Sequence, residues 1–184
     1  GRFQLDNLAC ALALIELVGD RELVVSEHAV RQGVRQVAWE GRLEVVGEAS
    51  TILLDGAHNP AASAVLADYL AEYRQARPGI RVCLVFGMMR DKHPREFLAP
   101  LLPLVDRIIL TQADLPRAIS GSELHALLRE YCPTAQVAAT PADACVLAKR
   151  WAGPSDLICV TGSLMLVGDI KAHLRGCSLS PVRG

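Results

Sequence analysis

The chain has 184 residues, of which 51% are hydrophobic, 4% aromatic and 21% charged, and its formal net charge is −1 at pH 7. This length suffices for one ordinary domain and a short additional segment, and the core must be built mainly from aliphatic side chains. The even balance of charge argues against a basic tail that would bind nucleic acid without sequence preference. The composition also argues against a disordered chain and a small disulfide scaffold.

The cysteines and the first apolar stretch favour a location in the reducing cytoplasm. None of the six cysteines forms a C-x-x-C pair and most lie in apolar runs, so we expect reduced thiols in the core. Residues 5–18 are apolar, but the stretch is too short for a membrane span and lacks the flanks of a signal peptide. The chain begins with Gly1 and not with Met, which is expected of a piece of a longer protein.

Two helices are predicted near the amino terminus. Ala and Leu dominate residues 5–18, and Gly19 is a suitable stop. A second helix is predicted to begin after Ser26, a good N-cap, with Glu27 in its first turn. The pattern changes after this helix, so residues 1–37 are interpreted as the end of a preceding domain and a linker.

Residues 38–184 are predicted to form a second domain in which short β-branched runs alternate with longer helical ones. The predicted strands are residues 43–46, 51–54, 82–86, 107–110, 136–138 and 157–160. The predicted helices are residues 60–76, 94–102, 120–131, 141–151 and 164–174. Continuous apolar strands separated by helices are typical of parallel strands buried on both faces. We therefore predict an α/β, Rossmann-like fold with an open, mostly parallel sheet, helices on both faces and a hairpin at one edge.

Polar residues follow the second predicted strand, at the edge where open parallel sheets bind ligands. Asp55 and His58 either point at a ligand or belong to a strand-to-helix turn in which Asn59 caps the helix. In the first case Asp55 would hold a ribose hydroxyl or a metal-bound water. We expect Asp55 to be a solvent-facing loop residue whose replacement leaves the melting temperature unchanged.

Two other loops at the same edge carry candidate binding residues. Lys92 lies in the charged loop 90–93 and either holds a carboxylate or phosphate or is a solvated cation. Ser163 ends the run Thr161-Gly162-Ser163 before the last helix, which is either an anion site or an ordinary cap. The methionines of this region are expected to serve packing rather than function: Met88, Met89 and Met165.

Several nucleotide and catalytic motifs are absent. The sequence contains no G-x-x-x-x-G-K-[ST] phosphate loop, no G-x-G-x-x-G fingerprint, no G-x-S-x-G elbow and no zinc-ligand cluster. The predicted sheet therefore has a ligand-binding edge but lacks a triphosphate cradle of its own.

Five motifs in order resemble those of folylpolyglutamate and dihydrofolate synthases. They are Gly1-x-x-Gln4-x-x-Asn7-x-x-x-Ala11, Trp39-Glu40-Gly41-Arg42-Leu43-Glu44, Asp55-Gly56-Ala57-His58-Asn59-Pro60, Gly87-x-x-x-Asp91-Lys92 and Thr161-Gly162-Ser163-Leu164-x-x-Val167-Gly168. Together they span essentially the whole chain, which resembles the carboxy-terminal domain of these enzymes with the end of their central ATPase domain. His93 and Met165 depart from the family pattern, which often has Asp and an aromatic residue there.

The resemblance implies an ATP-dependent ligase that joins glutamate to dihydropteroate or a folate through an acyl phosphate. The missing amino-terminal ATPase domain would supply the phosphate loop, the Mg²⁺ ligands and a carboxylated lysine, so this fragment alone is expected to be inactive. By position, Asn7, Arg42 and Asp55 would contact ATP and His58 would lie near its phosphates, which makes Arg42 and His58 the candidates for catalysis. Lys92 and Ser163 would hold the incoming amino acid.

Other functions stay open at this stage. A Mur-type peptidoglycan ligase domain belongs to the same wider group, although the D-G-A-H-N-P string argues against it. A non-catalytic nucleotide-sensing module would bind ATP tightly as this fragment alone, and the missing phosphate loop argues against that. The sequence leaves open whether the parent enzyme adds the first glutamate, later ones or both.

Overall fold

The structure, a computed structural model, describes residues 3–19, 24–47 and 50–177. Its internal contacts divide the chain into two compact units, residues 1–40 and 41–184. The first unit contains helices α1 (Phe3–Gly19) and α2 (Glu27–Gln36), as the sequence predicts. The Ser26 hydroxyl caps α2 by accepting a hydrogen bond from the amide of Ala29 at 3.2 Å.

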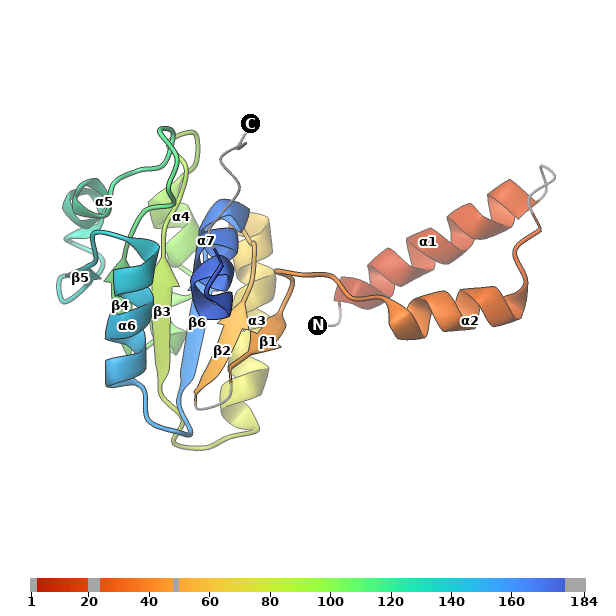
Figure 1. Cartoon of the computed structure of the whole chain (residues 1–184), viewed down its shortest axis with the longest axis horizontal. Coiled ribbons are helices and arrows are strands. Elements are labelled where there is room, and N and C mark those ends of the chain that lie inside the picture. The colour runs from red at the N-terminus through yellow and green to blue at the C-terminus, as the bar shows by residue number, and fades with distance from the viewer. Residues whose placement is uncertain (1–2, 20–23, 48–49, 178–184) are drawn as a thin grey trace. The chain divides into compact units, whose positions relative to one another are not determined.

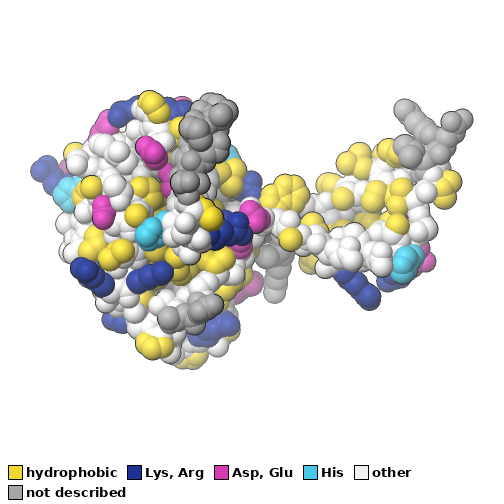
Figure 2. Space-filling model, in the orientation of Figure 1, with side chains coloured by type: hydrophobic (Ala, Val, Ile, Leu, Met, Phe, Trp, Pro, Cys, Tyr) yellow, Lys and Arg dark blue, Asp and Glu magenta, His cyan; other side chains and the backbone are white. Residues whose placement is uncertain are grey.

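Helix α1 is rich in apolar side chains, and many of them are exposed. The side chains of Leu5, Leu14 and Leu17 are 61–66% exposed, and Figure 2 shows apolar side chains gathered on the surface of the first unit. Helices that are hydrophobic on all sides are normally buried inside larger proteins. None of the helices in the described ranges combines the length and apolar character needed to cross a lipid bilayer.

The second unit is built on a six-stranded sheet with the order β1-β2-β6-β3-β4-β5 (Figure 1). The strands are β1 (Glu44–Val46), β2 (Thr51–Leu54), β3 (Val82–Phe86), β4 (Arg107–Leu110), β5 (Gln136–Val137) and β6 (Leu157–Thr161). Strand β1 pairs antiparallel with β2 at one edge, and the other neighbouring strands are parallel. The predicted fold class and the edge hairpin are therefore confirmed.

Helices cover both faces of this sheet, because the strand side chains alternate between two apolar clusters. On one face, Leu84 and Phe86 pack with side chains of α3 (Pro60–Gln75), α4 (Pro94–Leu98) and α5 (Gly121–Leu128). On the other, Cys83 and Val85 pack with α6 (Pro141–Trp151) and α7 (Leu164–Arg175). Four of the six cysteines are buried, and all six are free thiols. Burial raises the pKa of the Cys83 thiol to about 12, so it stays protonated and acts as a core side chain.

Several predicted elements differ from the structure; the predicted helix 120–131, for example, is Gly121–Leu128. Three of the differences have a clear physical reason. The predicted helix 94–102 ends at Leu98 and is followed by a separate 3-10 turn (Leu102–Leu104), because Pro100 has no amide proton to continue the helical hydrogen bonds. The first strand begins at Glu44 and not at residue 43, because Leu43 has φ +47°. Strand β5 is exposed and not buried on both faces, because it lies at the edge of the sheet.

The strand order fixes where a ligand can bind. Strand β6, the last along the chain, lies between β2 and β3, so the loops that follow these three strands meet at one edge. In open parallel sheets, ligands bind beyond the carboxyl ends of the strands, where the strand order reverses.

Candidate functional site

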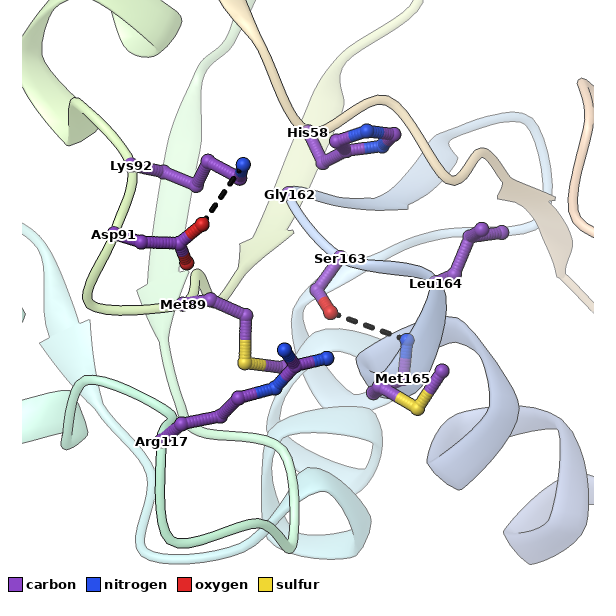
Figure 3. Close-up of a pocket in the computed structure, with 9 residues that line it drawn as sticks. All are labelled: His58, Met89, Asp91, Lys92, Arg117, Gly162, Ser163, Leu164 and Met165. Carbon is purple, nitrogen blue, oxygen red and sulfur yellow. Dashed lines mark hydrogen bonds and ion pairs between the residues drawn. The ribbon is translucent and has the colours of Figure 1, made fainter. Parts of the chain in front are cut away.

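A pocket of about 250 Å³ lies at this carboxyl edge of the sheet (Figure 3). The loops after β2, β3, β4 and β6 all contribute to its lining: His58, Met89, Asp91, Lys92, Arg117, Gly162, Ser163, Leu164 and Met165. Three of the sequence-predicted site residues, His58, Lys92 and Ser163, are thereby brought together.

Asp55 is buried beneath the turn that follows β2, with only 5% of its surface exposed, so the expectation of a solvent-facing side chain is wrong. Its two carboxylate oxygens accept hydrogen bonds from the amides of Ala57 at 2.9 Å and Leu43 at 3.0 Å. Burial raises the pKa of this carboxyl, and the two amide donors oppose that shift. Asp55 therefore ties the end of β2 to the segment that carries Arg42.

Arg42 lies in a tightly held turn at the start of the second unit. The flanking residues Gly41 and Leu43 both have positive φ, +68° and +47°. The Gly41 carbonyl accepts a hydrogen bond from the amide of Gly56 at 2.7 Å. The amide of Gly41 donates to the Glu44 carboxylate, also at 2.7 Å. This carboxylate in turn accepts from the buried Lys171 ammonium of α7 at 2.6 and 2.8 Å. Backbone bonds and one ion pair thus set the position from which Arg42 extends.

His58 is half-buried, and its ring orientation is set by the local backbone. The Nδ1 atom lies 2.9 Å from the carbonyl oxygen of Gly56, which places the proton on Nδ1. Nε2 is left as the acceptor of the neutral ring, which suits a role as a hydrogen-bond or proton acceptor toward a ligand.

Lys92 and Asp91 form an ion pair in the pocket, with 2.9 Å between the ammonium nitrogen and the carboxylate oxygen. The ammonium holds the pKa of the Asp91 carboxyl below its usual value. The Lys92 side chain is 36% exposed, so its remaining donors can still reach a ligand.

Ser163 is the N-cap of α7, and its hydroxyl oxygen accepts from the amide of Met165 at 3.1 Å (Figure 3). Its O–H donates to no acceptor within the described ranges and remains available at the pocket wall. The positive end of the α7 dipole lies at the same place and favours an anion.

The pocket does not include every predicted residue. Arg42 and Asp55 lie beside it and not in its lining, and the side chain of Leu164 approaches both Gly41 and Gly56. Asn7 belongs to the first unit, where its amide donates to the Gln4 side chain at 3.1 Å. Gly1, the first residue of the amino-terminal motif, lies outside the described residues.

Arg117 is a pocket residue that the sequence reasoning missed, whereas Met165 was singled out as a departure from the family pattern. Arg117 follows β4, and its position after a predicted strand was the available signal. Met165 is 38% exposed and lines the pocket, so the expectation that it serves packing alone is wrong. Met88 and Met89 are buried, although Met89 also lines the pocket.

The residues that the structure describes do not form a metal-binding cluster. Within residues 3–19, 24–47 and 50–177, no group of three or more His, Cys, Asp or Glu side chains could hold a metal ion. The residues present do not fit a Mg²⁺ site of their own.

Residues 41–164 match the family described as "Mur ligase, glutamate ligase domain". The chain belongs to this family. It is 32% identical to a probable bifunctional folylpolyglutamate synthase/dihydropteroate synthase of Haloferax volcanii, over 93% of this chain and 20% of that protein. The match extends over only a fifth of that relative's length.

Solved structures agree with this assignment. The Escherichia coli enzyme FolC in complex with DHPP and ADP superposes with a TM-score of 0.80 at 30% identity, over 92% of this chain and 39% of that one. The bifunctional folylpolyglutamate synthase/dihydrofolate synthase of Yersinia pestis, complexed with AMPPNP and Mn ion, superposes with a TM-score of 0.73 at 32% identity. That match covers 84% of this chain and 36% of the other. The chain corresponds to the carboxy-terminal domain of such enzymes.

Proposed function

We propose that this domain is the carboxy-terminal part of an ATP-dependent ligase that adds glutamate to dihydropteroate or a folate. The observation that carries the proposal is the pocket at the carboxyl edge of the sheet, whose lining includes both cationic side chains and the N-terminus of α7. Such a pocket suits a small substrate with carboxylates. The Haloferax and Yersinia relatives are named as folylpolyglutamate synthases, and the two solved relatives hold ADP or AMPPNP, which supports the same substrates.

In the proposed reaction, a carboxylate oxygen of the pteroate or folate attacks the γ-phosphorus of ATP, and ADP leaves. The amino nitrogen of glutamate then attacks the carbonyl carbon of the acyl phosphate, phosphate leaves, and one proton is lost from the nitrogen. Arg42 serves the ATP side directly, and the buried Asp55 serves it by holding the segment that carries Arg42. Lys92 and Ser163 serve the glutamate side. His58 lies between the two sides, where its Nε2 can accept a hydrogen bond.

The rest of the catalytic machinery is assigned to a preceding domain. The described residues offer no metal cluster and the sequence has no phosphate loop, so both are expected from that domain. The exposed apolar side chains of α1 support an origin of residues 1–37 in the same domain, because a partner surface would cover them. Asn7 of α1 would then join the ATP contacts. The free cysteines support a cytoplasmic location for the enzyme.

Product analysis tests this function directly. The full-length enzyme is incubated with ATP, glutamate and either dihydropteroate or a reduced folate, and the products are analysed by mass spectrometry. We expect a product heavier by one glutamate residue, formed together with ADP and only when all three substrates are present. ADP release without a glutamylated product would contradict the proposal, and a product from a peptidoglycan precursor would favour the Mur-type alternative.

A further inference from the structure

One face of α7 lies against the turn formed by residues 41–44. Leu164, Val167 and Lys171 are spaced by three and then four residues, so they follow one another along the same side of the helix. A Cβ atom added to Gly41 would lie 3.2 Å from the side chain of Val167 and 3.6 Å from that of Leu164. The two apolar side chains therefore pack against the turn, and Lys171 is the charged member of the same face.

Lys171 is a buried cation whose partner is fixed to this turn. Only 8% of its surface is exposed, and its ammonium donates to both carboxylate oxygens of Glu44, at 2.6 and 2.8 Å. One of these oxygens also accepts from the amide of Gly41 at 2.7 Å. Because water and salt screen a buried ion pair only weakly, the ammonium holds the carboxylate in one position under the turn.

The backbone is clamped on both sides of Arg42. On the side before it, Gly41 is held by the Glu44 carboxylate, and on the side after it the amide of Leu43 donates to the buried Asp55 carboxylate at 3.0 Å. Leu43 has φ +47°, a conformation that is costly for a residue with a side chain and persists only where its surroundings fix it. Loss of either clamp would let the turn relax and would displace the guanidinium of Arg42.

We propose that Lys171 is a positioning residue for the reaction: through Glu44 it fixes the backbone from which Arg42 reaches the phosphates of ATP. The inference rests on the proposed ligase function. Lys171 lies outside the lining of the pocket, so it acts through this chain of contacts and not on a substrate. A cation that stabilises charge in a transition state must be held in place beforehand, and a displacement of about 1 Å can cost roughly 10²-fold in rate. Without the ammonium, the Glu44 carboxylate would turn toward water and the Gly41 amide would lose its acceptor.

The test is a double-mutant cycle of Lys171→Met and Arg42→Ala in the full-length ligase, with turnover measured as glutamylated product. Met keeps an unbranched side chain and removes only the charge. Alone, Lys171→Met should lower kcat roughly 10- to 100-fold and leave the glutamate KM within about twofold of wild type. In the Arg42→Ala protein the same substitution should change kcat by less than about twofold, because the effects of residues that act through one another are not additive.

Arg81→Met is the matched control. The ion pair of Arg81 with Asp156 lies at the opposite end of the sheet, where β3 and β6 begin, so its loss should leave kcat unchanged whatever it does to the melting temperature. If Lys171→Met does not fold, Glu44→Gln takes its place. It keeps the shape of the side chain but weakens its hold on the ammonium, and it should lower kcat with the same lack of additivity toward Arg42→Ala.

Three results would overturn the inference. The first is an unchanged kcat in Lys171→Met. The second is an equal fall in kcat with and without Arg42, because Lys171 would then support the fold in general. The third is a fall of the same size in Arg81→Met, since the loss of any ion pair would then slow the enzyme. A wild-type enzyme that makes no glutamylated product would instead refute the ligase function, and the inference with it.

Discussion

At Asp55, the buried carboxylate is an acceptor for two backbone amides from different parts of the chain. Asp55→Asn replaces one of the two oxygens by an NH₂ group, which would face an amide donor. We expect a loss of about 1–3 kcal/mol in the free energy of unfolding, as for other buried groups left without a partner. Thermal unfolding of the two proteins measures this difference. Equal melting temperatures would mean that these two hydrogen bonds contribute nothing to stability.

Lys92→Ala should behave in the opposite way. Lys92 is partly exposed and its partner Asp91 is exposed as well, so the pair adds little to stability. We expect an unchanged melting temperature and a glutamate KM raised roughly tenfold or more, with the ATP KM nearly unaffected. Steady-state kinetics that vary ATP and glutamate separately provide the measurement. A shift in the ATP KM alone would remove Lys92 from the amino-acid side of the site.

For individual site residues, the sequence predicted the position after a strand but not the burial or the contacts of the side chain. His58, Lys92 and Ser163 were predicted at the ligand edge, and they line one pocket. The burial of Asp55 could not be predicted, because it depends on Leu43, which lies 12 residues earlier and has an unusual backbone conformation. Arg117 was missed because its pocket position depends on a bridge between two loops that are far apart in sequence.

Among the elements, the junction between β6 and α7 depends on Gly162. This residue has φ +102°, and a Cβ atom there would lie 2.5 Å from the carbonyl oxygen of Gly87 and 2.7 Å from the Phe86 ring. Gly162→Ala must therefore shift the loop that positions Ser163. We expect a lower melting temperature together with a large loss of ligase activity. Gly168→Ala in α7 is the control, since no atom lies within 4 Å of its added Cβ. A stable and fully active Gly162→Ala protein would show that the loop tolerates the shift.

The elements themselves were mostly predictable because their signals are local. Continuous apolar runs predict β3 and β6, and Ser26, Asn59 and Ser120 cap the helices that follow them. The early end of α4 was also predictable from Pro100, although the apolar pattern alone suggested a longer helix. The insertion of β6 between β2 and β3 is a long-range pairing, which no local signal in the sequence specifies.

For the molecule as a whole, Asp156 stabilises the end of the sheet opposite the pocket, where strands β3 and β6 begin. Its carboxylate accepts from the backbone amides of Arg81 and Gly153 and pairs with the Arg81 guanidinium, which joins the starts of β3 and β6. This guanidinium lowers the pKa of Asp156. The stability that Asp156 contributes is therefore present above the unfolded-state pKa of 3.8 and is lost as pH falls through the lower folded-state value.

Asp156→Asn should accordingly lower the melting temperature at pH 7 and leave the KM values for ATP and glutamate unchanged. The difference in melting temperature from wild type should shrink as the pH falls below about 4. Thermal unfolding from pH 7 to pH 3 tests the sign of this effect. A difference that grows toward acid pH would contradict the assigned shift in the pKa of Asp156.

If the carboxyl edge of this sheet closes over ATP during catalysis, Arg42 is the cation that it carries toward the phosphates. The decisive measurement is the steady-state turnover of Arg42→Ala in the full-length ligase, with the glutamate KM and the melting temperature determined in parallel. We predict that kcat falls roughly 10²–10³-fold, as when one preorganised contact to a transition state is lost, while the glutamate KM and the melting temperature change little. An unchanged kcat would mean that Arg42 is a surface cation and that this edge does not take part in the reaction.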